Sequence, residues 1–159
     1  MAKSGGYTNR GGIVDLKPHL DDVRIQKLLT SSMGFPTPEK IKKVVQHYHS
    51  KTAWKLMGFE LDGLITGCIG IEIIKQRQAR IRHLAVVPDF QRQGIARSMI
   101  QQISDTYGLI SISAETDNES LEFYRKTGFT ITSLGEKYPG VERFRCELKV
   151  KQKRITSSS

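Results

Sequence analysis

The sequence is poor in the residues that cross-link or metallate small proteins. Its 159 residues include two cysteines, Cys68 and Cys146, and each lies at an alternating position of an apolar, strand-like run. This placement is typical of small buried side chains and argues against a disulfide framework. The histidines offer no metal-ligand spacing, because His47 and His49 are two residues apart and would point to different faces of a helix. We therefore expect no metal site.

Long apolar runs and internal repeats are also missing. No stretch approaches the roughly 20 apolar residues that cross a bilayer, so we expect no membrane contact. The first dozen residues contain Lys3, Arg10 and four glycines but lack the apolar core of a secretory signal. We interpret residues 1–11 as a flexible leader and expect a cytoplasmic protein. The chain length predicts a single domain, which we place at residues 12–150.

Acidic residues are few: 16 Asp and Glu stand against 25 Lys and Arg, which gives a formal net charge of +9. Such a balance suits a nucleic acid, a polyanionic cofactor or a simply solvated surface. The basic residues are spread along the chain, and the local cluster of Lys149, Lys151, Lys153 and Arg154 lies beside a Ser-rich end. We interpret residues 151–159 as a flexible basic tail. Nucleic-acid binding is the minority interpretation, because no aromatic stacking motif accompanies the charge.

Hydrophobic periodicity predicts an α/β domain. The pattern indicates, in order, a strand, two helices, three strands, a helix, a strand, a helix and two strands. Asp62-Gly63 predicts a two-residue hairpin, and Thr37-Pro38-Glu39 predicts the start of a helix. The closing hairpin joins residues 129–134 to 141–150, and its alternating last strand offers an edge through which a second copy could form a homodimer.

The segment Gln91–Ala96 predicts an anion site. It follows the strand-like run Arg80–Val87 and precedes a helix with an apolar stripe. The first N–H groups of such a helix have no intrahelical acceptor, its dipole favours an anion, and Gly94 lets the backbone approach a ligand closely. The side chains of Arg92 and Arg97 are either electrostatic helpers at this site or solvated surface groups.

Two segments resemble the GNAT superfamily of N-acetyltransferases. Gln91–Ala96 has the spacing Gln-x-x-Gly-x-Ala and is similar to the family motif Gln/Arg-x-x-Gly-x-Gly/Ala. Asp117–Phe129 is similar to the second signature, Asn-x-x-Ala-x-x-Phe/Leu-Tyr-x-x-x-Gly-Phe. The order of elements matches as well. The resemblance implies a GNAT fold, with a central mixed and largely antiparallel sheet of about seven strands, four flanking helices and a splay between the fourth and fifth strands.

The resemblance also implies an activity. Acetyl-CoA would be the cosubstrate, and its acetyl group would move to a primary amine of a small molecule or peptide by direct attack in a ternary complex. In the family, a bulged strand frees backbone groups for the pantetheine arm and the thioester, and the glycine turn holds the pyrophosphate. The cofactor contacts expected here are Leu84, Ala85, Val86, Gln91, Arg92, Gln93, Gly94, Ile95, Ala96, Arg97, Asp117 and Asn118.

The same resemblance makes Tyr124 the general acid that would protonate the coenzyme A thiolate. The alternative is a tyrosine that packs on the sheet with its hydroxyl at the rim. The match departs from the family pattern in two places. Asp117 stands where many members have an asparagine that binds the pantetheine arm, and neighbouring Asn118 either replaces it or only caps the helix. Ile112 stands where some members carry a catalytic glutamate.

Glu72 and Glu115 are the remaining candidates for the base, because each is an acid inside a strand-like segment where burial could raise its pKa. Glu72 could instead pair with Arg80 or Arg82 on the next strand, and Glu115 could be solvated at a strand end. A water relay, or a substrate that arrives already neutral, is equally open. His83 is a weaker candidate, because a lone histidine in a strand is more often structural.

The sequence also suggests how an acceptor is attracted and leaves two alternative functions open. The acids Glu115, Asp117, Glu119 and Glu122 crowd one region of a basic chain and would attract an amine-bearing acceptor. The missing family glutamate leaves open a different class, a catalytically weak coenzyme A-binding module. A basic nucleic-acid-binding domain is the third and weakest alternative.

Overall fold

The computed structural model describes residues 11–152, so the expected leader and tail lie almost wholly outside the described residues. The strands are β1 (Gly12–Asp15), β2 (Trp54–Leu61), β3 (Leu64–Lys75), β4 (Gln78–Val86), β5 (Ser111–Thr116), β6 (Thr130–Tyr138) and β7 (Val141–Lys149). The helices are α2 (Val23–Ser31), α3 (Pro38–Ser50), α4 (Ile95–Thr106) and α5 (Asn118–Lys126), with short 3₁₀ helices at Lys17–His19 and Pro88–Phe90. This order of elements is the predicted one.

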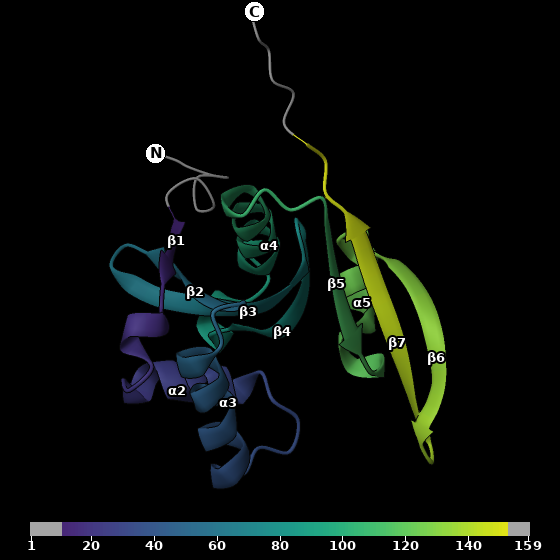
Figure 1. Cartoon of the computed structure of the whole chain (residues 1–159), viewed down its shortest axis with the longest axis horizontal. Helices are drawn as coiled ribbons and strands as arrows, with labels where there is room; N and C mark the ends of the chain where they lie inside the picture. Colours follow the sequence, from purple (N-terminus) through teal and green to yellow (C-terminus); the bar gives the residue numbers. More distant parts are fainter. Residues whose placement is uncertain (1–10, 153–159) are drawn as a thin grey trace, which may run out of the picture.

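The seven strands form one mixed sheet in the order β1-β2-β3-β4-β5-β7-β6. Every neighbouring pair is antiparallel except β4 and β5, which are parallel. That parallel pairing runs only from Gln78↔Ser111 to Arg80↔Ser113, and beyond it the two strands part (Figure 1). The predicted splay between the fourth and fifth strands is therefore confirmed. The predicted free edge at the last strand is wrong, because β7 is paired on both sides and β6 forms that edge.

Local sequence signals set several of the element boundaries. Asp62 and Gly63 have φ values of 52° and 85°, as a type I′ hairpin between β2 and β3 requires. The Thr37 hydroxyl accepts a hydrogen bond from the Lys40 N–H at 3.1 Å and caps α3. Asp22 caps α2 in the same way. No helix of the described residues is long and apolar enough to cross a membrane.

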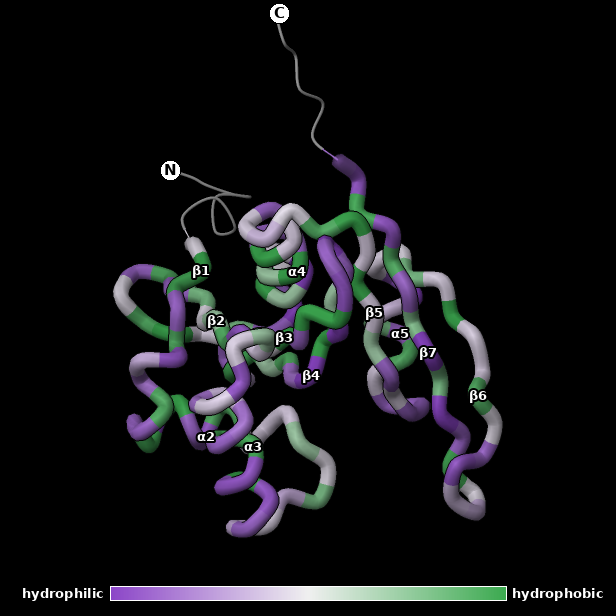
Figure 2. Tube along the Cα trace, in the orientation of Figure 1, coloured by the Kyte–Doolittle hydropathy of each residue, from purple (hydrophilic) through white to green (hydrophobic). Residues whose placement is uncertain are grey.

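Helices cover the two faces of the sheet and create two cores. The larger core lies between the sheet and the helices α4 and α5, and it includes Phe59, Ile71, Met99 and Ile112. The smaller core lies beneath α2 and α3 and includes Leu29 and Tyr48. Figure 2 shows the hydrophobic colour gathered in α4 and the central strands, whereas polar and apolar residues alternate along the β6–β7 hairpin. Both cysteines are free and buried, as expected from their alternating positions.

An extra residue interrupts the ladder between β3 and β4. Gly70 is paired with His83 and Ile71 with Ile81, so one step along β3 matches two steps along β4, with Arg82 as the extra residue. Before this bulge, Ala79 and Ile81 face the larger core; after it, Leu84 and Val86 do so. The bulge therefore reverses the alternation of β4 just before the strand reaches the splay.

Gly70 provides a close approach between the sheet and α3. A Cβ atom built on Gly70 would lie 1.8 Å from the Tyr48 hydroxyl oxygen, whereas one built on Gly34 would meet nothing within 4 Å. Tyr48 is fully buried in a closely packed core, so its ring cannot move aside easily.

Gly70→Ala should lower the free energy of unfolding by about 1–3 kcal/mol, because the added methyl overpacks a closed site. Urea denaturation measures the change. Gly34→Ala is the matched control and should leave stability within about 1 kcal/mol of the wild type. Equal stability of the two variants would contradict the close packing of Tyr48 on β3.

Candidate active site

The splay between β4 and β5 leads into a cavity of about 840 Å³. Its walls are the end of β4, the turn before α4, the first turn of α4 and one side of α5. The lining includes Leu84, Ala85, Val86, Phe90, Gln91, Arg92, Gly94, Ile95, Ala96, Arg97, Glu119, Ser120, Phe123, Tyr124, Lys126 and Thr127. The cavity thus brings together the predicted contacts on β4 and in the glycine turn, Gln93 excepted, with Tyr124. Asp117 and Asn118 are not on the lining.

The N-terminus of α4 has no side-chain cap. Asp22, Thr37 and Asp117 each cap their helices with a side-chain oxygen, whereas Gly94 at the same position of α4 has no such oxygen. The first N–H groups of α4 consequently remain available, next to the positive end of the helix dipole. Gly94 has a φ of 81°, which glycine adopts without strain, and Arg92 has a φ of 65°. This turn fits an anionic group such as a pyrophosphate.

Side chains of the turn fix its position against the neighbouring elements. The Gln91 Nε2 donates to the Val86 carbonyl oxygen at 3.0 Å, which ties the turn to the end of β4. The Arg97 guanidinium donates to the Lys126 carbonyl oxygen at 3.0 Å, at the C-terminus of α5. Arg97 therefore joins α4 to α5 across the cavity, while its charge remains on the lining. The Gln93 side chain reaches the Asp89 carbonyl instead, at 3.5 Å.

The backbone of β4 beyond Arg80 offers hydrogen-bonding groups to the splay. The Val87 N–H donates to the Thr66 carbonyl of β3 at 2.8 Å. Because backbone groups of an antiparallel strand alternate in direction, those of Val86 and Leu84 point away from β3 and toward β5. The contact between the Val86 carbonyl and the Gln91 side chain agrees with this direction. Since β5 pairs with β4 only as far as Arg80, the Leu84 and Val86 groups face the cavity.

Tyr124 packs between two aromatic rings on the cavity wall. The ring centroids of Phe123 and Phe129 lie 5.1 and 5.0 Å from that of Tyr124, both in edge-on geometry. Burial, with a smaller effect of Cys146, raises the pKa of Tyr124 well above its ordinary value. The phenol is therefore protonated at neutral pH and can act as a donor. Its hydroxyl makes no hydrogen bond to any residue of the range 11–152, so this donor is available to a ligand in the cavity.

The candidate bases lie outside the cavity and are engaged elsewhere. The Arg82 Nε donates to a carboxylate oxygen of Glu72 at 2.9 Å, which is the ion pair considered as the alternative role of Glu72. Glu115 lies 3.6 Å from the Arg145 guanidinium, its cross-strand neighbour. Neither acid is on the cavity lining.

The predicted cluster of acids is largely engaged by its own neighbours. The Asp117 carboxylate accepts from the Glu119 N–H at 3.0 Å and caps α5, and Glu122 pairs with Arg125 at 3.0 Å. With Glu115 bound to Arg145, only Glu119 of the four lines the cavity. Little uncompensated negative charge is left there to attract an ammonium group.

A pair formed by buried Tyr48 and half-buried His83 is the feature that sequence reasoning missed. The Tyr48 hydroxyl lies 2.6 Å from the His83 Nδ1. Burial raises the pKa of Tyr48, while burial and then Arg82 lower the pKa of His83 to about 4. The protonated phenol must therefore donate to Nδ1, which places the histidine proton on Nε2. Nothing local signals this pair, because its members are 35 residues apart.

A family model described as an acetyltransferase (GNAT) domain matches residues 54–131. An uncharacterized N-acetyltransferase in the lysA 3′ region of Bacillus methanolicus is 26% identical over 69 residues, which make up 43% of this chain and 58% of that relative. The chain thus spans less than two thirds of the relative's length.

Solved structures share the fold. The ribosomal-protein-S18-alanine N-acetyltransferase from Escherichia coli superposes with a TM-score of 0.70 at 16% identity. The aligned region covers 94% of this chain and 99% of the other. A GNAT family acetyltransferase from Elizabethkingia anophelis, solved with acetyl-CoA bound, has a TM-score of 0.65 at 20% identity. Here the aligned region covers 89% of this chain and 99% of the other.

The low pKa of His83 predicts a pH-dependent stability. Between about pH 6.5 and pH 4 the unfolded chain binds a proton at His83 that the folded state excludes, so stability falls as the pH falls through this window. The loss is at most about 1.4 kcal/mol per pH unit. Urea denaturation of the wild type and of His83→Gln across this range isolates the effect. On acidification the wild type should lose more free energy of unfolding than the variant does. An equal loss in both proteins would contradict a lowered pKa of His83 in the folded state.

Proposed function

Because this chain belongs to the GNAT family, we propose that it is an N-acetyltransferase that moves an acetyl group from acetyl-CoA to a primary amine of a small molecule or peptide. One observation carries the proposal: β4 parts from β5 directly in front of the uncapped N-terminus of α4. A single cavity therefore joins free strand backbone to an anion site. We assign this activity to one domain at residues 12–150.

Acetyl-CoA supplies an acetyl thioester at one end of a flexible arm and a pyrophosphate toward the other. The N–H groups from Gln93 to Arg97 would hold the pyrophosphate, with the Arg92 and Arg97 charges beside it. The β4 backbone at Leu84 and Val86 would pair with the arm as a neighbouring strand does. The side chains of these two residues belong to the core and need not change for this role.

Transfer by direct attack needs few protein groups. The amine nitrogen attacks the thioester carbonyl carbon, the C–N bond forms, and the C–S bond breaks. A backbone N–H of β4 aimed into the splay would stabilise the charge on the carbonyl oxygen. The Tyr124 hydroxyl would donate a hydrogen bond and then a proton to the departing thiolate. A water molecule that accepts the amine proton fits the structure better than Glu72 or Glu115, because both acids are in ion pairs outside the cavity.

The comparisons support an amine acceptor without identifying it. The structural relative from Escherichia coli is named for an alanine of ribosomal protein S18, and the sequence relative from Bacillus methanolicus is named an N-acetyltransferase. A coenzyme A-binding module without catalysis is the second candidate, because buried Ile112 stands where some family members carry a catalytic glutamate. Binding of the donor is common to both candidates, and turnover separates them.

Acetyl-CoA should raise the melting temperature of the protein. A donor present at about 100 times its dissociation constant stabilises the folded state by about 2.7 kcal/mol. Differential scanning fluorimetry measures the shift. S-acetylpantetheine, which lacks the pyrophosphate, is the matched ligand and should bind far more weakly if the α4 N-terminus holds that group. Equal shifts with the two donors would remove the pyrophosphate from this site.

Tyr124→Phe should lower kcat by about 100-fold or more, because the leaving thiolate loses its proton donor. Thiol release with a panel of primary amines measures turnover, and calorimetry should find the affinity for acetyl-CoA nearly unchanged. Tyr107→Phe is the matched control, because Tyr107 is a half-buried phenol outside the cavity lining. Unchanged turnover in Tyr124→Phe would return this residue to a packing role. Donor binding without thiol release for any amine in the wild type would favour the binding module.

A further inference from the structure

The sheet face opposite α4 and α5 carries a row of polar side chains beside the splay. Glu72, Arg80, Ser113 and Glu147 are register neighbours across β3, β4, β5 and β7. A second cavity, of about 170 Å³, lies along this row, and its polar lining comprises Gln78, Arg80, Ser111, Ser113, Arg145 and Glu147. This cavity shares no lining residue with the one assigned to acetyl-CoA.

Arg80 is a half-buried cation in this cavity without a carboxylate partner. Its register neighbour Glu72 pairs instead with Arg82, the residue that the bulge adds to β4. Arg145, the other arginine on the lining, is next to Glu115. Among residues 11–152 no carboxylate lies within 4 Å of the Arg80 guanidinium, which leaves its five N–H donors for a ligand.

Two serines share the cavity lining with Arg80. Ser113 is its cross-strand neighbour on β5, and the hydroxyls of Ser111 and Ser113 make no hydrogen bond to any described residue. A guanidinium flanked by free hydroxyls is a donor set that matches a carboxylate or a phosphate. Glu147 is the opposing charge on the lining; it is exposed to solvent, which screens it more than the half-buried Arg80.

The position of Arg80 relates this cavity to the proposed reaction. The first cavity occupies the α4 and α5 side of the sheet, so an acceptor that meets the thioester in the splay can approach from the opposite face. Arg80 is on that face and precedes Leu84 by four residues on the same strand. At 3.2–3.4 Å per strand residue, the two positions are about 14 Å apart at most.

We propose that the acetyl acceptor is an amine that also carries a carboxylate or phosphate group, and that Arg80, with Ser111 and Ser113, holds this group. The inference rests on the proposed acetyltransferase function, and it specifies that the acceptor carries an anionic group. The anionic group fixes one end of the acceptor while its amine reaches the splay. It also reverses the expectation drawn from the sequence, in which acids near α5 attract the acceptor's ammonium, because three of those four acids are already engaged.

The test compares matched amines with and without the anionic group. ω-Amino acids of increasing length are paired with alkylamines of the same carbon number, and a parallel series of aminoalkyl phosphates distinguishes the two anions. At the best length, kcat/KM should exceed that of the uncharged amine by about 10- to 100-fold, as expected for a charge-assisted contact. Equal values for charged and uncharged amines at every length would overturn the proposal.

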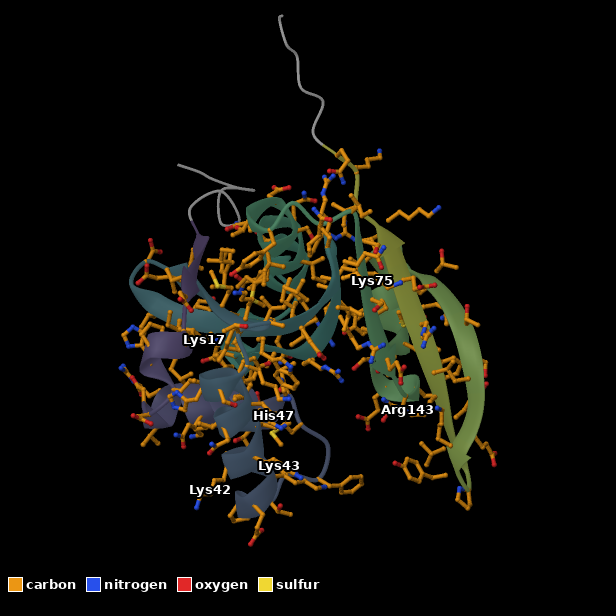
Figure 3. All side chains as sticks on the ribbon, in the orientation of Figure 1. Lys17, Lys42, Lys43, His47, Lys75 and Arg143 are labelled. Atoms are coloured by element: carbon orange, nitrogen blue, oxygen red, sulfur yellow. The ribbon has the colours of Figure 1, made fainter. Side chains whose placement is uncertain are left out.

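Three variants locate the effect. Arg80→Gln should abolish the preference for the anionic acceptor, and Glu147→Gln should strengthen it. Arg143→Gln is the matched control, because Arg143 is on β7 toward the β6–β7 turn and outside this cavity (Figure 3). A preference that survives Arg80→Gln, or that Arg143→Gln removes equally, would overturn the assignment. An unchanged melting shift with acetyl-CoA confirms that each variant is folded.

A binding measurement separates this inference from the proposed function. Calorimetric titration of the ω-amino acids into the protein saturated with coenzyme A reports the acceptor site without turnover. Binding that depends on Arg80 would support the inference even if no acetyl group is transferred, in which case only the proposed function fails. Absence of Arg80-dependent binding at all lengths and for both anions would overturn the inference, whatever the result for turnover.

Discussion

The extra residue in β4 is the constraint on which the site depends. With Arg82 inserted between Ile81 and His83, the strand bends and changes the direction of its side chains while keeping an apolar row on the larger core. Just before this point β4 still pairs with β5; just after it the two strands part. The parallel ladder thus ends next to the bulge, and the part of β4 that lines the cavity lies beyond it. The same residue draws the Glu72 carboxylate away from Arg80. The bulge thus lies next to both an open stretch of β4 backbone and a guanidinium without a carboxylate partner.

The second requirement is a helix that begins without a cap. Three of the helices between residues 11 and 152 begin with a side-chain oxygen that accepts from their own first turn, and α4 begins with Gly94, which has none. Without a cap, the first backbone N–H groups of α4 have no acceptor from the helix itself. A bound anion would supply the missing acceptor. Contacts at both ends of the turn hold it in place, since Gln91 reaches β4 and Arg97 reaches the end of α5. The turn is thereby ordered before any ligand arrives, which reduces the entropy that binding must overcome.

Features encoded in neighbouring residues could be predicted from the sequence, and features that depend on long-range pairing could not. The hairpin at Asp62-Gly63 and the glycine turn at Gly94 have local signatures, because a positive φ or a helix start restricts the residue type. The family signatures indicated the splay and the position of Tyr124. No local pattern placed the bulge at Arg82, which depends on how β3 and β4 align. The free edge was assigned wrongly for a similar reason: β7 enters the sheet between β5 and β6, although β6 precedes it in the chain.

The Tyr48–His83 pair shows how the bulged strand keeps its position. Beyond Arg80, β4 has an extra residue and pairs with β3 alone. A strand supported on one side would be expected to move, and movement of Leu84 would displace any group held against its backbone. His83 lies between the bulge and Leu84. The Tyr48 hydroxyl holds the His83 ring through a hydrogen bond of 2.6 Å to Nδ1. Tyr48 is itself buried against Gly70 on β3 and against Trp54, whose ring is 5.2 Å away. Because the pair is neutral, it anchors β4 without placing a buried charge beside the splay. The smaller core therefore contributes to the site by fixing the one strand that both proposed ligands would use.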